Sequence, residues 1–386
     1  ADRIIFGSDY RKHNDSLKEA FLAGYSGEVL DVGDCPTPAV SFHSREWGAC
    51  LTASHNPAGY NGLKPIRERH VAFSRELEQL EQEYYCVVAE GNNPAGGNHI
   101  TVNEANVTPA PELLAEYLDA LPAFEGGVFD LGGGAACSVK QIFPETIFCQ
   151  PDPGFVCRDP LPEDASLTKL KEITSRRSVL GFAFDGDADR VMAVDAGKVI
   201  DGGIATCLIA RQLLKHGDEI VVNIDFMQET KQRLADDGYR VVVCPVGTKY
   251  CVEALEREGA KLAAERNGHY YFRDHMLDSD GLYAAALLSG EKPGSLAQFS
   301  STFKNVMLVE KVECRVDFAK LSQLAERRGA VVDTMDGVLA EFENFTLLVR
   351  ASNTAPIIRI NSEAANRPQA EEGMAVAKKL LKECAA

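Results

Sequence analysis

The chain of 386 residues is long enough for more than one domain, and its 45% hydrophobic and 25% charged residues are the proportions of an ordinary folded protein. Its 57 acidic and 40 basic residues give a formal net charge of −17, which argues against a general nucleic-acid binder. No apolar run is long enough to span a bilayer, and the first twelve residues lack the pattern of a signal peptide, so we expect a soluble, cytoplasmic protein that is not held in a membrane.

The composition also limits the ligand chemistry and the redox state. Because charges farther away than about 8 Å are largely screened, an anionic ligand must be captured by local Arg and Lys side chains. The eleven cysteines are scattered and never spaced as CxxC. We therefore expect free thiols in a reducing compartment, with a disulfide or zinc framework as the alternative.

Short apolar runs alternate with amphipathic stretches along most of the chain. The predicted strands of this part lie at 4–7, 29–33, 49–54, 126–134, 179–185, 219–225 and 240–246. Helices are predicted between them, at 16–25, 38–47, 111–121 and 202–214. This order of strand and helix predicts α/β layers with mostly parallel sheets.

Interruptions of this alternation of strands and helices divide the chain into four predicted domains. Three mixed α/β domains are expected at 1–105, 106–202 and 203–308. The last domain, 309–386, contains strand-like segments at 311–317, 345–352 and 356–364, which predict a small antiparallel sheet with helices, an α+β domain.

The stretch LTASHNPAGYNGLK, residues 51–64, ends an apolar run with a serine in a turn that Pro57 prevents from continuing as a helix. A serine hydroxyl is a weak nucleophile that needs activation by a base or a metal. No G-x-S-x-G elbow surrounds Ser54, which argues against an α/β-hydrolase.

The stretch FAFDGDADRVMAV, residues 182–194, ends a buried strand in three carboxylates at alternate positions, Asp185, Asp187 and Asp189. Their convergence would need a cation, and Mg²⁺ fits a set of oxygen ligands. An EF-hand is excluded because Arg190 and Ala196 stand where glycine and glutamate would be required. A structural acidic loop or a solvated turn is the alternative. With a serine near such a metal, the pattern indicates phosphoryl transfer through a phosphoserine.

Two further stretches suggest the binding of a sugar phosphate. In VRASNTAPIIRI, two arginines and several polar groups fall within ten residues: Arg350, Ser352, Asn353, Thr354 and Arg359. This donor set suits a phosphate dianion, with a polar hairpin as the alternative. In AAERNGHYYFRD, Glu265, Asn267 and His269 suit sugar hydroxyls, although an exposed loop without function is an alternative.

The chain resembles the α-D-phosphohexomutases, the phosphomannomutase/phosphoglucomutase family, because four motifs occur in the order found there: TASHNP, DGDADR, E-x-x-GH and RASNTAPIIR. The resemblance covers nearly the whole chain. The resemblance implies three similar mixed α/β domains and a C-terminal phosphate-binding domain around a central cleft. It also implies an isomerase that interconverts hexose 1-phosphates and 6-phosphates of mannose or glucose through a bound 1,6-bisphosphate, with Mg²⁺ as cofactor.

The resemblance implies a role for each matching residue. Ser54 resembles the serine that is phosphorylated and that completes the Mg²⁺ site of Asp185, Asp187 and Asp189. Arg190 would face the phosphoryl group, and His55 and Lys64 resemble residues that move protons near the serine. The polar groups of the two further stretches, Glu265 to His269 and Arg350 to Arg359, would bind the sugar and the phosphate that does not react.

The sequence departs from the family pattern at three places. The usual opening strand, with its arginine, is expected to be missing, because residues 4–25 resemble the family's second strand and helix. Asn267 and Ala355 stand where Ser and Glu are common. Three alternatives follow: an impaired relative that only binds sugar phosphates, a metal-dependent phosphatase, and a phosphoglucosamine mutase.

Overall fold

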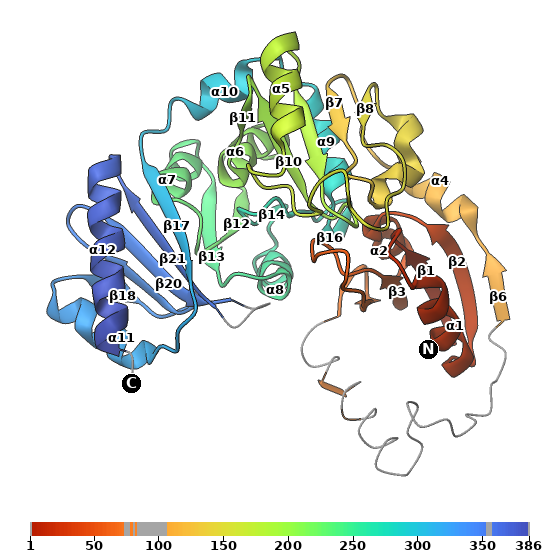
Figure 1. Cartoon of the computed structure of the whole chain (residues 1–386), viewed down its shortest axis with the longest axis horizontal. Coiled ribbons are helices and arrows are strands. Elements are labelled where there is room, and N and C mark those ends of the chain that lie inside the picture. The colour runs from red at the N-terminus through yellow and green to blue at the C-terminus, as the bar shows by residue number, and fades with distance from the viewer. Residues whose placement is uncertain (1, 73–77, 80–81, 83–105, 353–356, 385–386) are drawn as a thin grey trace. The chain divides into compact units, whose positions relative to one another are not determined.

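The computed structural model describes residues 2–72, 78–79, 82, 106–352 and 357–384, which form helices and four β-sheets (Figure 1). By their packing the residues divide into two compact units. Unit 1 comprises Ala1–Gln212 and Asn267–Ala297, and unit 2 comprises Leu213–Arg266 and Gln298–Ala386.

The first sheet belongs to unit 1 and has the strand order β5-β4-β3-β1-β2-β6. Its strands are β1 (Arg3–Ser8), β2 (Glu28–Asp34), β3 (Trp47–Leu51), β4 (Leu63–Arg67), β5 (His70–Val71) and β6 (Asn106–Pro109). β1 pairs in parallel with β2 and β3, β2 pairs in parallel with β6, and β4 joins antiparallel to β3. The helices of this part are α1 (Asn14–Gly24) and α2 (Thr37–His43). The helix predicted at 38–47 ends at His43, because the chain must extend again to enter β3.

The second sheet, also in unit 1, has the order β11-β10-β9-β7-β8. Its strands are β7 (Val128–Asp130), β8 (Thr146–Ile147), β9 (Gly181–Phe184), β10 (Val191–Asp195) and β11 (Lys198–Val199). The accompanying helices are α4 (Pro111–Asp119), the 3₁₀ segment η1 (Ala135–Ile142) and α5 (Thr168–Arg177). Apolar residues of α5 and of this sheet form one buried cluster, which includes Leu170, Ala183 and Val194.

The next part of the chain contributes to both units. In unit 2, β12 (Glu219–Asn223) pairs in parallel with β13 (Arg240–Cys244) and β14 (Leu262–Ala264), accompanied by α7 (Gln228–Asp236) and α8 (Thr248–Glu258). In unit 1, β15 (Tyr270–Phe272) and β16 (Met276–Ser279) form an antiparallel pair, accompanied by α6 (Gly202–Leu213) and α9 (Gly281–Ser289). The helix α10 (Ser295–Ser300) lies where the chain passes from unit 1 to unit 2.

The three α/β parts repeat one pattern of pairing. In each part the first strand (β1, β7 or β12) lies between the second and the third, all parallel, and an antiparallel pair follows the third strand in the sequence. The connection that leaves the third strand carries Ser54 after β3, the three aspartates after β9, and Glu265 to His269 after β14. Three similar mixed α/β parts are therefore confirmed, and three of the predicted motifs occupy equivalent turns. The exact domain boundaries stay a prediction.

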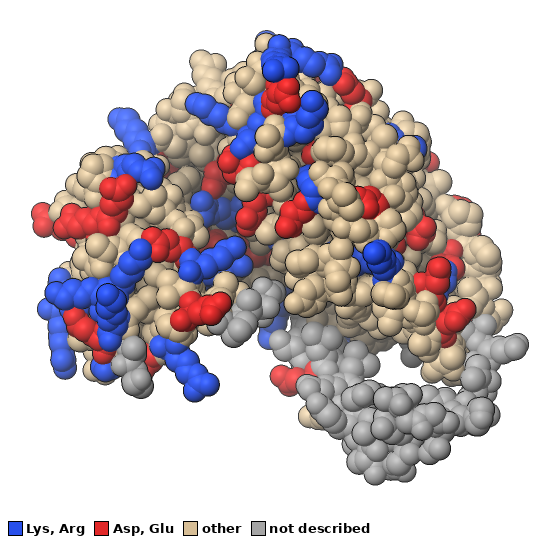
Figure 2. Space-filling view, in the orientation of Figure 1, with Lys and Arg blue, Asp and Glu red and all other residues tan. Residues whose placement is uncertain are grey.

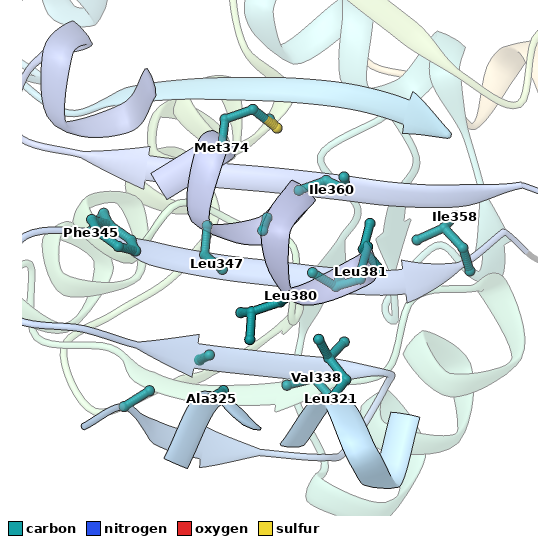
Figure 3. Packing of buried hydrophobic residues seen from close by; sticks show 14 of the residues in the cluster. Leu321, Ala325, Val338, Phe345, Leu347, Ile358, Ile360, Met374, Leu380 and Leu381 are labelled. Carbon is teal, nitrogen blue, oxygen red and sulfur yellow. The ribbon is translucent and has the colours of Figure 1, made fainter. Parts of the chain in front are cut away.

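The C-terminal part is an antiparallel sheet of order β17-β21-β20-β19-β18 in unit 2, blue in Figure 1. Its elements are β17 (Val306–Val312), α11 (Phe318–Arg327), β18 (Val331–Asp333), β19 (Val338–Glu341), β20 (Thr346–Ala351), β21 (Ile358–Ala364) and α12 (Arg367–Cys384). Figure 3 shows Leu380 and Leu381 of α12 and Leu321 of α11 packed on the strands. The strand predicted at 311–317 is misplaced: it ends at Val312 because β21, its partner, begins at Ile358 opposite that residue.

The cysteines and the hydropathy of the helices can be compared with what the composition predicts. The ten cysteines described there are free thiols, as expected, and the eleventh, Cys86, lies outside the described residues. Of the helices that the structure describes, none is both long and apolar enough to cross a membrane. Figure 2 shows acidic and basic side chains interspersed on the face it draws.

Candidate active site

Ser54 lies in the turn that follows β3 and adopts the left-handed backbone conformation, with φ of 49°. A non-glycine residue there needs support from its surroundings. The backbone N–H of Ser54 donates to Oγ1 of Thr52 at 2.8 Å. The Oγ of Ser54 donates to Oδ2 of Asp185 at 3.1 Å and lies 3.4 Å from Nδ1 of His55. The turn therefore presents the hydroxyl to the aspartate loop.

The aspartate loop follows β9 and curls back on itself, with Ala188 at φ of 60°. Asp185, Asp187 and Asp189 are all buried, and one carboxylate oxygen of each lies within 4.8 Å of the others. Gly186 permits the approach to the serine turn, because a Cβ there would lie 2.4 Å from the carbonyl oxygen of Ser54. The predicted convergence of three carboxylates beside a serine is found within unit 1.

Two cationic side chains offset part of this buried negative charge. Nζ of Lys64 donates to Oδ2 of Asp187 at 2.7 Å and to Oδ2 of Asp189 at 2.8 Å. Burial by itself would lower the pKa of Lys64, but the carboxylates of Asp187 and Asp189 raise it well above its ordinary value. Nε of Arg190 lies 3.6 Å from Oδ2 of Asp185. Lys64 is therefore held as an ammonium ion in this arrangement.

The carboxylates nevertheless differ in their preference for a proton. Burial, followed by the charges of Asp189 and Asp187, raises the pKa of Asp185 well above its usual range. Burial opposes ionisation of Asp189 as well, but Lys64 and Arg190 outweigh it and lower the pKa of that carboxyl. Lys64 and Arg190 thus stabilise the ionised form of Asp189 better than that of Asp185.

The residues of this cluster fit a hard divalent cation. Oδ1 of Asp187 and Oδ1 of Asp189 are buried and have no hydrogen-bond donor among the residues that the structure describes. A buried carboxylate oxygen without a partner is costly, and a metal ion with oxygen ligands would remove that cost. The three aspartates can therefore hold a metal ion.

His269 is joined to the aspartate loop through backbone and side-chain contacts. His269 and Arg190 form an isolated antiparallel β-bridge. The backbone N–H of Val191 donates to the carbonyl oxygen of Gly268 at 3.1 Å. The Oγ of Ser279 donates to the carbonyl of Asp189 at 2.6 Å and lies 2.9 Å from Nδ1 of His269. Since the hydroxyl proton of Ser279 is used on Asp189, Nδ1 of His269 is the donor in this pair.

His269 and His55 are both uncharged near neutral pH. Burial and the positive charge of Arg190 lower the pKa of His269 well below its ordinary value. Burial and Arg190 likewise lower the pKa of His55 to about 4. With its proton on Nδ1, neutral His269 keeps Nε2 as an acceptor for a ligand hydroxyl.

The other predicted sugar-binding residues divide between the units. Asn267, in unit 1, accepts from the N–H of His269 through Oδ1 at 3.4 Å. Glu265, in unit 2, is buried, and its Oε2 accepts from Nδ2 of Asn223 at 3.1 Å. Their role in sugar recognition stays a prediction.

Of the predicted phosphate-binding residues, the structure describes Arg350 in β20, Ser352 just after that strand, and Arg359 in β21, all in unit 2. Arg350 and Arg359 are opposite each other in the antiparallel register, and the N–H of Ser352 donates to the carbonyl of Ile357 at 2.9 Å. Nε of Arg350 donates to Oδ2 of Asp336 at 3.0 Å. Its Nη2 is buried and has no acceptor among the described residues. Asn353 and Thr354 lie outside the described residues.

Four hydrogen bonds near the site, which involve Thr37, Asp278 and Arg11, were not predicted from the sequence. Oγ1 of Thr37 donates to Oδ2 of Asp187 at 2.7 Å, and the N–H of Thr37 donates to the carbonyl of Asp187 at 3.0 Å. Asp278, whose pKa is raised to about 6 mainly by burial, accepts from Oγ of Ser41 at 2.6 Å. Arg11 donates to the carbonyl of Ser54 at 2.6 Å. The available signal was the position of Arg11 and Thr37 just after parallel strands, where sites are usually built.

Three protein-family models match the chain. They describe phosphoglucomutase/phosphomannomutase alpha/beta/alpha domain I at residues 1–85, alpha/beta/alpha domain III at residues 201–293, and the C-terminal domain at residues 305–379. The matched ranges contain Ser54, Glu265 to His269, and the arginines near the C-terminus, respectively.

Curated relatives match along nearly the whole chain. A phosphoglucomutase/phosphomannomutase of Thermococcus kodakarensis is 30% identical, over 98% of this chain and 90% of its own length. A phosphoglucosamine mutase of Pelotomaculum thermopropionicum is 29% identical, over 96% of this chain and 88% of its own length.

Solved structures share the fold. A phosphoglucomutase/phosphomannomutase family protein from Burkholderia thailandensis superposes with a TM-score of 0.83 at 22% identity, over 100% of this chain and 90% of that chain. The N-acetylphosphoglucosamine mutase of Aspergillus fumigatus, solved in complex with GlcNAc-6P and magnesium, superposes with a TM-score of 0.64 at 15% identity, over 91% of each chain.

Proposed function

Because the chain belongs to the phosphoglucomutase/phosphomannomutase family of α-D-phosphohexomutases, and is therefore a phosphomutase of the isomerase class, we propose that it interconverts hexose 1-phosphates and hexose 6-phosphates through phosphorylated Ser54. Mannose and glucose phosphates are the proposed substrates. A hexose 1,6-bisphosphate is the proposed bound intermediate and the activator that first phosphorylates the serine.

The observation that carries this proposal is the contact between Ser54 and the aspartate loop. Oγ of Ser54 lies 3.1 Å from Oδ2 of Asp185, next to two buried carboxylate oxygens that lack hydrogen-bond donors among the described residues. Nδ1 of His55 lies 3.4 Å from Oγ of Ser54, but the shorter contact of the hydroxyl is with an acidic cluster that is suited to a cation and not with that histidine. This combination supports phosphoryl transfer at Ser54.

The proposed reaction has two half-reactions that balance. In the first, a free hydroxyl of the sugar monophosphate attacks the phosphorus on Ser54, the P–Oγ bond breaks, and the attacking hydroxyl loses its proton while Oγ becomes a hydroxyl. The product is the bound 1,6-bisphosphate. After this intermediate has turned around, Oγ of Ser54 attacks its other phosphorus, the bond from that phosphorus to the sugar oxygen breaks, and the serine hydroxyl loses its proton while the sugar oxygen becomes a hydroxyl. The phosphoserine is regenerated, and the isomeric monophosphate is released.

The residues around Ser54 are suited to the charge that develops in this transfer. Mg²⁺ is the proposed metal on Asp185, Asp187 and Asp189, where its chemistry would be to offset the negative charge of the phosphoryl oxygens. Arg190 supplies a guanidinium on the same loop, as expected for a group that faces the phosphoryl oxygens. Because Lys64 is held as an ammonium, it is suited to donate a proton or a hydrogen bond rather than to accept one.

Several polar side chains are proposed to bind the substrate. His269, with Nε2 as an acceptor, and Glu265 and Asn267 are proposed to bind sugar hydroxyls. Arg350 and Arg359, with Ser352, Asn353 and Thr354, are proposed to bind the phosphate that does not react. The unsatisfied Nη2 of Arg350 supports this assignment.

A second candidate activity is phosphoglucosamine mutase. It is favoured by the Pelotomaculum thermopropionicum relative, which carries that name and matches over 96% of this chain. The chemistry at Ser54 would be the same, and only the contact to the sugar's 2-position would differ.

A mutase assay with Mg²⁺ and a trace of glucose 1,6-bisphosphate tests both candidates, using the 1-phosphates of mannose, glucose and glucosamine. We expect conversion of at least one sugar, and a loss of about 10⁴-fold or more in the Ser54→Ala variant, because residues that carry a covalent intermediate cannot be replaced. Ser138→Ala, which alters another half-buried serine of unit 1, should keep full activity. Turnover retained in Ser54→Ala, or release of inorganic phosphate in place of isomerisation, would overturn the proposal.

A further inference from the structure

Arg11 belongs to the segment just after β1 and contacts the serine turn. Its side chain is completely buried. Nη2 donates to the carbonyl oxygens of Ser54 at 2.6 Å and of Asn56 at 2.7 Å. Nη1 donates to those of Pro57 and Tyr60, both at 3.0 Å. One guanidinium therefore binds four carbonyl groups of the turn that presents the serine.

The fifth donor of this guanidinium is used on a buried carboxylate. Nε of Arg11 donates to Oδ2 of Asp9 at 3.1 Å, and the backbone N–H of Arg11 donates to Oδ1 of Asp9 at 2.9 Å. A guanidinium has five N–H donors, so every donor of Arg11 has an acceptor. The face of the guanidinium is covered by the ring of Phe155, at 5.0 Å from Cζ to the ring centroid.

The same carboxylate also holds the other side of Ser54. Oδ2 of Asp9 accepts from Oγ1 of Thr52 at 2.8 Å, and Oγ1 of Thr52 accepts from the N–H of Ser54 at 2.8 Å. The carbonyl of Ser54 is bound by Arg11, and Arg11 is bound by Asp9. Both backbone polar groups of Ser54 are thus connected to one buried ion pair.

This arrangement acts on a residue whose backbone conformation needs support. Ser54 is at φ of 49°, which costs of the order of 1 kcal/mol or more for a residue with a Cβ. The hydrogen bonds of the Arg11 guanidinium are made to the serine turn and to Asp9. None of these bonds is made to a strand of the first sheet. A role confined to holding the sheet together would not need four bonds to one turn.

We propose that Arg11, together with Asp9 and Thr52, is a positioning group that keeps Oγ of Ser54 beside Asp185 while the serine gains and loses its phosphoryl group. This inference rests on the proposed function of Ser54. Arg11 touches neither the substrate nor the reacting atoms in this assignment; it acts through the backbone of the turn. Displacement of a reacting group by about 1 Å can lower a rate by about 10²-fold, which sets the size of the expected effect.

The test compares Arg11→Lys with the wild type and with Arg69→Lys. Lysine keeps the charge but cannot reach four carbonyls with a planar fork of donors. Arg69, in the same part of unit 1, donates to the carbonyl of Phe42 at 2.8 Å and stands over its ring, so its replacement is a matched control outside the serine turn. The readouts are kcat, KM for the 1-phosphate, and the rate at which glucose 1,6-bisphosphate phosphorylates Ser54, followed by mass spectrometry.

We expect Arg11→Lys to lower kcat and the rate of Ser54 phosphorylation by about 10²-fold with KM changed less than about threefold, and Arg69→Lys to leave all three unchanged. Thr52→Val, which keeps Arg11 but cuts the bond to the N–H of Ser54, should lower the phosphorylation rate by about tenfold. Thr52→Ser, which keeps the hydroxyl, should restore it. This second pair decides the outcome if Arg11→Lys does not fold.

Equal phosphorylation rates in the folded Arg11→Lys variant and the wild type would overturn the positioning role while leaving the phosphoserine mechanism intact. If Thr52→Ser were as slow as Thr52→Val, the bond to the Ser54 N–H would be irrelevant and the inference would also fail. Absence of Ser54 phosphorylation in the wild type itself would instead overturn the proposed function. The three results are therefore distinguishable.

Discussion

Each unit contains a cluster of charged side chains, acidic in unit 1 and basic in unit 2, and the charge of the two clusters is compensated differently. The aspartate loop after β9 gathers three carboxylates and offsets them with Lys64 and Arg190. The antiparallel pairing of β20 with β21 places Arg350 opposite Arg359, and the carboxylate of Asp336, which lies 3.0 Å from Nε of Arg350, supplies a compensating negative charge. In both clusters the compensation leaves buried polar atoms unpaired among the described residues: Oδ1 of Asp187 and of Asp189, and Nη2 of Arg350.

The difference lies in what would complete each cluster. Unpaired carboxylate oxygens need a cation, whereas an unpaired guanidinium nitrogen needs an anion. The acidic cluster is held by contacts from several segments, namely Thr37, Lys64 and the serine turn. The basic cluster depends on the register of two neighbouring strands and on Asp336, which also accepts from the N–H of Val246 at 3.0 Å. We infer that the acidic cluster decides the rate of the chemistry and the basic cluster decides how tightly the substrate binds.

The largest effect that would sharpen this comparison is expected for Asp187→Asn. The change removes one negative ligand from the acidic cluster but keeps the volume and the acceptor for Thr37. We expect kcat to fall by about 10³-fold, and the Mg²⁺ concentration for half-maximal activity to rise at least about tenfold, because a metal site is sensitive to each ligand. A metal titration of activity measures both, with Asp31→Asn as the control. An unchanged titration would remove Asp187 from the metal site.

An intermediate effect is expected for Arg350→Lys in the basic cluster. Lysine keeps the charge but loses the nitrogen that has no acceptor among the described residues. A hydrogen bond to a charged group contributes about 1.5–3 kcal/mol, so KM for the sugar phosphate should rise by about 10- to 100-fold while kcat changes much less. Steady-state kinetics checks this, with Arg367→Lys on the exposed face of α12 as the control. If kcat fell and KM did not, the division of roles between the two clusters would be wrong.

A smaller effect is expected for Gly186→Ala, which tests whether the acidic cluster needs its close contact with the serine turn. A Cβ would lie 2.4 Å from the carbonyl oxygen of Ser54, so the two loops must separate. Overpacking of this kind typically costs about 1–3 kcal/mol, and we expect activity to fall by about tenfold. Thermal unfolding and kcat are the measurements. Gly24→Ala, where a Cβ meets no atom within 4 Å among the described residues, should change neither; wild-type activity in Gly186→Ala would show that the contact is dispensable.

The smallest expected effect is that of bound Mg²⁺ on the stability of the folded protein. If Mg²⁺ binds the folded acidic cluster and not the unfolded chain, a concentration ten times the dissociation constant should stabilise the protein by about 1.4 kcal/mol. Calorimetry with and without a chelator measures this shift, and Asp187→Asn should lose it while Arg350→Lys keeps it. An equal shift in Asp187→Asn would place the stabilising metal elsewhere.

The α/β class, the antiparallel C-terminal part and the residues of the acidic cluster could be predicted from the sequence. These features are local: short apolar runs, turns marked by glycine and proline, and alternate aspartates separated by small residues can each be read within about a dozen positions. The structure brings Ser54, His55, Lys64 and Asp185 to Arg190 close together in unit 1, whereas their roles stay a prediction. Even the misplaced strand at 311–317 was wrong only in its bounds, which depend on the partner β21.

The contacts that support these residues could not be predicted, because they join segments that meet only in the folded chain. Arg11 is separated from Ser54 by 43 positions and Thr37 from Asp187 by 150, so no local pattern connects them. Their roles follow from where parallel strands end in space, and from the requirement that buried charges and buried backbone groups find partners. That requirement acts on the folded chain as a whole, and for this reason the proposed site residues could be named from the sequence whereas the residues that contact them from distant segments could not.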